Sequence, residues 1–153
     1  MDELDFRILR ELQDHPSLSA EQLSKRVGLS HTPCWRRIKK MEADGIILER
    51  AVILNPEKLN LGLTVFASIK LKQHDRATLE AIETAAQNCP EIVECFSMTG
   101  DGDYICRVLV ADVPAYEKLL KNTLLALPGV ATVSSSVALK KIKLTTKIAI
   151  PSA

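Results

Sequence analysis

The sequence of 153 residues lacks several features that mark particular classes of protein. Its four cysteines form no CxxC pair and have no histidine at metal-ligand spacing, which argues against a zinc site. No apolar run approaches the roughly 20 residues that span a bilayer, and the acidic start lacks the apolar core of an export signal. These absences predict a soluble, cytoplasmic protein with reduced thiols, no metal and no membrane partner.

The chain also has few aromatic residues and a small net charge. The chain has three phenylalanines, two tyrosines and one tryptophan, so a core built from its 46% of hydrophobic residues is expected to be aliphatic. The formal net charge is only +1, and no overall basic field marks the chain as a nucleic-acid-binding protein. Any contact with nucleic acid must therefore come from a local cluster of cations.

Motifs for catalysis are missing from the sequence. There is no Gly-rich phosphate loop, no GxSxG and no HExxH, and the three histidines are scattered along the chain. Asp101 and Asp103 are spaced like an acid–base pair, but neither has an evident partner histidine or metal. We therefore expect no enzyme, no catalytic residues and no cofactor.

The strongest pattern is a helix-turn-helix at about residues 19–44. Ser19 and Gln22 form a capping box that opens a short helix. Gly28 ends this helix, because glycine enters the left-handed cap conformation at little steric cost. Ser30 is placed to begin a second helix.

The second helix of this pattern is rich in cations. Between Gln22 and Met41 there are six lysines or arginines and no acidic residue, which is typical of a helix that lies in a DNA major groove. Residues near the start of such a helix reach base edges, whereas later lysines hold phosphates. Trp35 either packs at the edge of the core or contacts the DNA backbone through its indole N–H. The residues expected to contact DNA are Ser30, His31, Thr32, Pro33, Trp35, Arg36, Arg37, Lys39 and Lys40.

The segments on either side complete a first domain over residues 1–54. Residues 4–13 have the apolar spacing of an amphipathic helix, so the domain has three helices. Residues 46–54 are rich in β-branched and aliphatic side chains and are expected to form a small wing. Residues 55–62 are interpreted as a linker.

Residues 63–153 are expected to form a second domain. Strands are expected at 63–72, 92–99, 104–111 and 130–139, with helices at 76–88 and 115–127. One further strand is expected at 144–150. The order β-α-β-β-α-β predicts a ferredoxin-like domain, so the whole chain is assigned to the α+β class.

The strands of the second domain stay apolar on both sides. Two helices bury only one face of a sheet, yet Ile92, Phe96 and Met98 oppose Val93 and Cys95 in one strand. The second face is therefore expected to meet the sheet of another copy, giving a homodimer. A twofold protein also suits a palindromic DNA site.

Several segments, taken together, make the chain resemble the Lrp/AsnC (leucine-responsive/asparagine-type) transcriptional regulators over essentially its whole length. The resemblance implies a winged helix-turn-helix and a ferredoxin-like effector domain. It also implies dimers that assemble into tetramers or octamers, and a free amino acid that binds between effector domains and changes DNA affinity or assembly. The segments are 4–13, 23–30, 32–38, 42–46, 100–104 and 128–130.

The loop Gly100–Tyr104 has two interpretations. Its composition alone predicts a hairpin turn, whereas the resemblance implies a place at the effector cleft. There Asp103 would bind the ammonium group of an amino acid, and the two glycines would admit its carboxylate. The serines near residue 135 form either a pocket wall or a sheet edge. The residues expected to bind the effector are Thr99, Gly100, Asp101, Gly102, Asp103, Tyr104, Thr132, Ser134 and Ser136.

The combined prediction is a nucleoid-associated, sequence-specific transcriptional regulator that responds to a free amino acid and controls amino-acid metabolism or transport. The apolar surroundings allow an apolar amino acid such as leucine or methionine, while the resemblance leaves cysteine and others open. The main alternative is an architectural DNA-organising protein with low sequence specificity and no effector. A binding module that ignores DNA fits poorly with the cationic helix. RNA binding fits poorly with strands that lack clustered aromatics.

Overall fold

A computed structural model describes residues 1–151 and divides the chain into two compact units. The first unit contains Met1–Ile53 together with residues 143–151, and the second contains Leu54–Ile142. The segment after residue 142, which was assigned to the second domain from the sequence, therefore packs with the first unit. Among the described residues, no helix is both long and apolar enough to cross a membrane.

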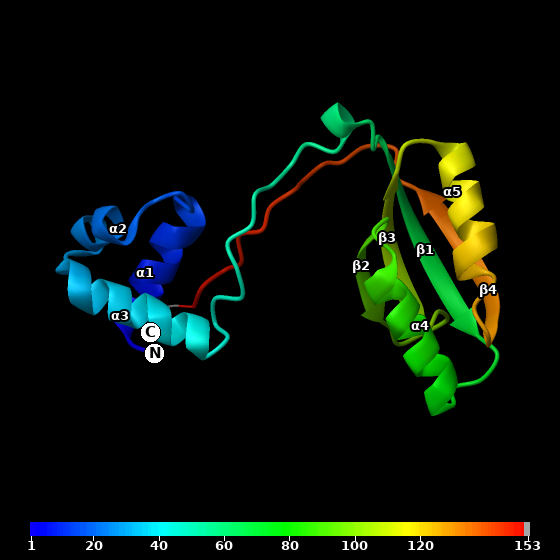
Figure 1. Cartoon of the computed structure of the whole chain (residues 1–153), viewed down its shortest axis with the longest axis horizontal. Helices are drawn as coiled ribbons and strands as arrows, with labels where there is room; N and C mark the ends of the chain where they lie inside the picture. The colour runs from blue at the N-terminus through cyan, green and yellow to red at the C-terminus, as the bar shows by residue number, and fades with distance from the viewer. Residues whose placement is uncertain (152–153) are drawn as a thin grey trace. The chain divides into compact units, whose positions relative to one another are not determined.

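Three helices form the first unit: α1 (Glu3–Asp14), α2 (Ala20–Val27) and α3 (His31–Ala43), as Figure 1 shows. The predicted capping box is present, because the Ser19 side chain accepts from the Gln22 N–H and the Gln22 side chain accepts from the Ser19 N–H. Gly28 ends α2 with φ +73°. Ser30 occupies the N-cap of α3, but its side chain makes no capping hydrogen bond.

The helices enclose a small aliphatic core. It contains one buried side chain from α1 and the inward faces of α2 and α3. The buried hydrophobic residues are Ile8, Leu23, Val27, Cys34, Ile38 and Met41. The inner side of the helix-turn-helix therefore packs on α1, and its outer side faces solvent.

Two strand predictions are wrong. Residues 46–54 and 144–150 contain no strand, because neither segment pairs with another strand. Their aliphatic side chains instead line a cavity of about 380 Å³ against α1. The Gln13 amide bonds both backbone groups of Ile148, at 2.7 and 3.1 Å, and Lys147 pairs with Asp14 at 2.7 Å. Both segments therefore run as extended chain beside α1, and many of their apolar side chains, such as Leu48 and Ile148, stay exposed.

The second unit begins with the predicted linker, which contains a short 3₁₀ helix, η1 (Glu57–Leu59). Its strands are β1 (Leu63–Leu71), β2 (Ile92–Ser97), β3 (Tyr104–Val110) and β4 (Val130–Val137). They form one sheet in the order β2-β3-β1-β4, and all neighbours are antiparallel. This is the order of the predicted ferredoxin-like unit.

Helices α4 (Arg76–Asn88) and α5 (Val113–Leu119) cover one face of this sheet (Figure 1). Their inward side chains, including Ile82 and Leu119, share one core with Val65, Ala67 and Ile69 of β1. The second helix was predicted as a single element over 115–127. It is shorter and continues as a π-helical segment, η2 (Leu120–Leu124).

Candidate DNA interface and effector site

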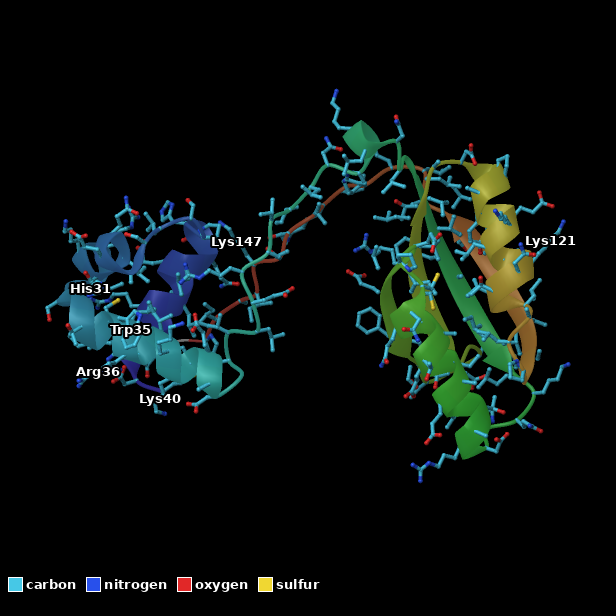
Figure 2. All side chains as sticks on the ribbon, viewed as in Figure 1. His31, Trp35, Arg36, Lys40, Lys121 and Lys147 are labelled. Atoms are coloured by element: carbon cyan, nitrogen blue, oxygen red, sulfur yellow. The ribbon has the colours of Figure 1, made fainter. Side chains whose placement is uncertain are left out.

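The outer face of α3 presents most of the residues predicted to contact DNA. Figure 2 shows His31, Trp35, Arg36 and Lys40 spaced along this helix. Eight of the nine predicted residues are exposed: Ser30, His31, Thr32, Pro33, Trp35, Arg36, Lys39 and Lys40. Trp35 keeps 46% of its surface exposed, so the indole is not a core residue. The start of α3 is thus an uncovered polar and cationic surface.

Arg37 differs from its neighbours. Its guanidinium lies 2.7 Å from a carboxylate oxygen of Asp5 and 2.8 Å from one of Asp2, at the N-terminus of α1. These hydrogen bonds raise the pKa of Arg37, and the side chain is only 31% exposed. Asp2 also caps α1 by accepting from the Asp5 N–H. Arg37 therefore fastens the predicted recognition helix to α1.

The two lysines further along α3 have acidic partners. Lys39 pairs with Glu42 at 2.7 Å and Lys40 with Asp44 at 3.0 Å. These acids lie just beyond the stretch that the sequence shows to be free of acidic residues. Such exposed pairs contribute little to stability. Arg36 makes no side-chain hydrogen bond or ion pair with any residue in the range 1–151.

The loop between β2 and β3 is held firmly by Asp103. One carboxylate oxygen accepts from the Leu71 N–H at 2.7 Å, and the other lies 2.6 Å from Nε2 of His74. The backbone hydrogen bond from Leu71 and the contact with His74 lower the pKa of Asp103. Its carboxylate therefore joins the hairpin to the end of β1. Asp101, in contrast, is exposed and has no side-chain partner among residues 1–151.

Gly102 allows a close approach between this loop and β1. A Cβ added at this position would lie 2.4 Å from the Ser68 hydroxyl oxygen. Gly100 meets no neighbour but has φ +110°, a conformation that favours glycine. The two glycines therefore serve the turn geometry, and Gly102 lies close to the Ser68 side chain.

The predicted effector residues are divided between the two faces of the sheet. On β4, Thr132 lies opposite Lys70 and Ser134 opposite Ser68, on the face that α4 and α5 leave uncovered. Tyr104 lies on the covered face, where its hydroxyl donates to Glu83 at 3.2 Å. The structure thus brings Thr132 and Ser134 to the same end of β1 as the glycine loop, and it separates them from Tyr104.

The serines of β4 lie on different faces of the sheet. Ser135 lies on the covered face, 2.5 Å from the Tyr116 hydroxyl of α5, while Ser134 and Ser136 lie on the uncovered face. β4 is an edge strand, as one interpretation of these serines required.

Two residues of this corner were missed from the sequence. Ser68 and Lys70 lie on β1 between the loop and β4, and the Lys70 charge contributes to the low pKa of Asp103. Only the alternation of side chains along the strand could have indicated these two residues, because both occupy polar positions of a largely apolar strand. The corner therefore brings a cation and several hydroxyls together.

The uncovered sheet face carries an apolar patch, which we call the open sheet face and define by Phe66, Phe96, Ile105 and Leu109. The register places Phe96 opposite Ile105, and Phe66 opposite Arg107. Phe66 and Phe96 are 39% and 57% exposed. Arg107 forms a bidentate pair with Glu94 at 2.8 and 3.0 Å, which neutralises the one charged position between them.

Two family models match the chain. The Lrp/AsnC ligand binding domain matches residues 64–148, and a winged helix-turn-helix DNA-binding model matches residues 1–47. The second match ends where the expected wing begins, in the stretch that forms no strand here. Together the two models account for both units.

Characterised relatives resemble the chain over nearly its whole length. The DNA-binding transcriptional activator DecR of Escherichia coli K12 is 38% identical over 150 residues, covering 98% of this chain and 99% of DecR. The leucine-responsive regulatory protein of the same strain is 41% identical, with 98% and 92% covered. A Neisseria meningitidis transcriptional regulator solved as an L-Met complex is 36% identical, with a TM-score of 0.91 over 97% of this chain and 96% of that one.

Proposed function

Since the chain belongs to the Lrp/AsnC family of DNA-binding transcriptional regulators, we propose that α3 reads its operator and that an amino acid bound beside the β2–β3 loop changes this binding. The exposed start of α3 carries the first half of the proposal, because it presents polar and cationic side chains on an otherwise packed helix. The proposed DNA contacts are the eight exposed residues of the predicted set, and Arg37 is given a structural role instead.

Arg36 is proposed to read a base, and Arg37 is proposed to hold the helix in place. An arginine without protein partners can form a bidentate contact with guanine, whereas Arg37 is already engaged by two carboxylates. Lys39 and Lys40 are proposed to hold phosphates. Trp35, which is half exposed, is proposed to contact the DNA backbone through its indole N–H.

The proposed effector is an apolar amino acid, with L-methionine as the first candidate. The Neisseria regulator, which is 36% identical, was solved with L-Met. Lys70 and the loop N–H groups are suited to its carboxylate, and Thr132 and Ser134 supply hydroxyls nearby. Asp101 replaces Asp103 as the proposed partner of its ammonium group, because the Asp103 carboxylate is occupied by Leu71 and His74.

We further propose a homodimer formed through the open sheet face, with assembly into tetramers or octamers. Its support is an apolar face that the helices of the same chain leave uncovered. No catalytic role is proposed, since the named relatives are regulators. A cytoplasmic location at the nucleoid follows from the proposed partners, which are double-stranded DNA and a free amino acid.

Fluorescence anisotropy tests this function directly. A labelled duplex from upstream of the gene is titrated with the full chain, at two salt concentrations, with and without each of the twenty amino acids. Tight binding there, weak binding to a scrambled duplex and a shift with one amino acid are expected. Binding that ignores both sequence and amino acids, with a steep salt dependence, would instead identify an architectural protein.

The effector site has its own test. Asp101→Asn and Lys70→Gln are expected to abolish the shift with L-methionine while the affinity for DNA without ligand stays unchanged. Glu80→Gln on the outer surface of α4 is the matched control. A full response in both loop variants would remove the proposed site while leaving DNA recognition by α3 intact.

A further inference from the structure

Two cysteines face each other across neighbouring strands of the second unit. Cys95 of β2 and Cys106 of β3 are register partners, and their sulfur atoms are 3.3 Å apart. Directly opposed residues in an antiparallel pair have Cα atoms about 4.5–5.5 Å apart, which lies within the range of disulfide-bonded cysteines. Closing a bond of about 2.05 Å thus needs movement of the sulfur atoms and no rearrangement of the strands.

The two thiols have different access and different acidity. Cys106 is 1% exposed in a central strand, whereas Cys95 is half-buried on the edge strand β2. The Cys106 thiol donates to the Cys95 sulfur, which lowers the pKa of Cys95 and raises that of Cys106. A partly exposed thiol with a lowered pKa, beside a second thiol, is the arrangement of a peroxide-reactive pair.

The other two cysteines lack this arrangement. Cys34 lies in the core of the first unit, where burial raises its pKa. Cys89 is also buried, and its thiol donates to Glu91 at 3.3 Å. Burial and this contact raise the pKa of Cys89. Neither has a second sulfur within bonding geometry among residues 1–151.

We propose that Cys95 and Cys106 form a redox modification site that a peroxide converts into a cross-strand disulfide. The Cys95 thiolate attacks one peroxide oxygen, the O–O bond breaks, and the departing oxygen takes up a proton. The resulting Cys95 sulfenic acid is attacked by the Cys106 sulfur, which displaces hydroxide, and the Cys106 proton converts that hydroxide to water. Two thiols are oxidised, and one peroxide is reduced to water and either water or an alcohol.

The bond would close a ring around the β2–β3 hairpin. That ring contains the whole loop 98–103, which the proposed function assigns to the effector. It would also tie the edge strand β2 covalently to β3. The oxidation itself requires neither DNA nor an amino acid, so its failure would leave the proposed function untouched.

Mass spectrometry of the full chain tests the proposal. The reduced protein is treated with a small molar excess of hydrogen peroxide, alkylated and digested at Asp and Glu. Glu94 separates Cys89 from Cys95, and Asp101 and Asp103 separate Cys95 from Cys106, so the linked peptides report the pairing. We expect a loss of two hydrogens and a Cys95–Cys106 peptide, both reversed by a dithiol reductant.

Single variants separate the roles of the two thiols. Cys106→Ser is expected to stop at a Cys95 sulfenic acid that dimedone captures, and Cys95→Ser is expected to take up no dimedone at position 106. Cys89→Ser, the control, keeps the disulfide. Both thiols surviving in the folded wild-type chain, or a bond that includes Cys89 or Cys34, would overturn the proposal, and circular dichroism confirms that each sample is folded.

Discussion

At the scale of single residues, Arg36 and Arg37 are adjacent in sequence but have different surroundings. Arg36 projects from the exposed side of α3 (Figure 2), while Arg37 is fixed between Asp2 and Asp5. Arg36→Ala is expected to lower operator affinity by about 1–3 kcal/mol and to relax specificity at one base pair, because a bidentate contact with guanine is lost. Anisotropy with the operator and with single-base variants measures both effects.

A matched control keeps this prediction specific. Arg76→Ala also removes an exposed arginine, but from the start of α4 in the second unit, and should leave operator binding unchanged. Arg37→Ala should lower thermal stability and weaken binding to all sequences alike, since it loosens α3 without removing a base contact. If Arg36→Ala behaves like Arg37→Ala, base reading by Arg36 is disproved.

Asp103 gives a prediction about pH. Its pKa is lowered in the folded protein by the Leu71 N–H and by His74, relative to an ordinary value of 3.8. A lowered pKa adds stability above the unfolded value, and that stability is lost as the pH falls through the folded value. Asp103→Asn should therefore be less stable than the wild type at neutral pH, and the difference should vanish in strong acid. Urea unfolding between neutral pH and about pH 2 measures this.

The companion variant for this experiment is Asp101→Asn. Asp101 is two residues away in the same loop but makes no corresponding hydrogen bonds within residues 1–151. The unfolding free energy of the Asp101→Asn variant should match that of the wild type at neutral pH, because no hydrogen bond of that carboxylate is lost. A constant difference between Asp103→Asn and wild type over the whole pH range would show that the carboxylate charge is not what stabilises the hairpin.

At the scale of elements, the turn before β4 depends on one glycine. Gly129 has φ +82°, and a Cβ there would lie 2.4 Å from Cγ2 of Thr78, a buried β-branched residue. Thr78 cannot turn away freely, because its hydroxyl donates to Asp75 at 2.7 Å. Gly129→Ala should cost about 2–4 kcal/mol through strain and overpacking. Thermal or urea unfolding measures it.

Gly62→Ala provides the control, since no atom lies within 4 Å of an added Cβ and its φ is not in the left-handed range. That variant should unfold like the wild type within about 0.5 kcal/mol. Equal stability of the two alanine variants would mean that α4 and the turn before β4 adjust to each other.

Elements with local signals were predictable from the sequence. The Ser19–Gln22 capping box and Gly28 are signals within one helical turn, and α2 begins and ends where they predict. The apolar residues of 46–54 and 144–150 carry no such signal, and period-2 alternation does not distinguish a paired strand from an extended segment that lines a cavity beside α1. Strand predictions failed in those segments because the partner surface lies far away in the chain.

The candidate sites likewise divide into features that local sequence predicts and features that depend on distant residues. Exposure along α3 follows from helical periodicity, so eight of nine predicted DNA residues are on its surface. The exception, Arg37, is engaged by carboxylates 32 and 35 positions earlier. Asp103 is likewise engaged by Leu71, 32 positions earlier. A sequence pattern identifies which side chains carry charge, but distant partners decide which of them remain free.

At the scale of the whole molecule, the open sheet face is an apolar surface that no element of the same chain covers. Phe66 and Phe96 expose large apolar surfaces beside Ile105 and Leu109, on a sheet whose other face is fully packed. Exposed apolar patches on a folded unit mark interaction surfaces, and a twofold contact would bury the same patch from both copies. Phe66→Glu should therefore shift the protein to monomers, because a carboxylate buried at a sheet-to-sheet contact has no cationic partner in the patch except the already paired Arg107.

Sedimentation at micromolar concentration decides this prediction, with Val113→Glu as the control. Val113 is a 62% exposed apolar residue at the start of α5, where a carboxylate favours the helix. Wild type and Val113→Glu should sediment as dimers or larger assemblies, and Phe66→Glu as a folded monomer with reduced affinity for a palindromic operator. A wild type that is monomeric, or a Phe66→Glu variant that assembles normally, would mean that the open sheet face is not the contact between copies.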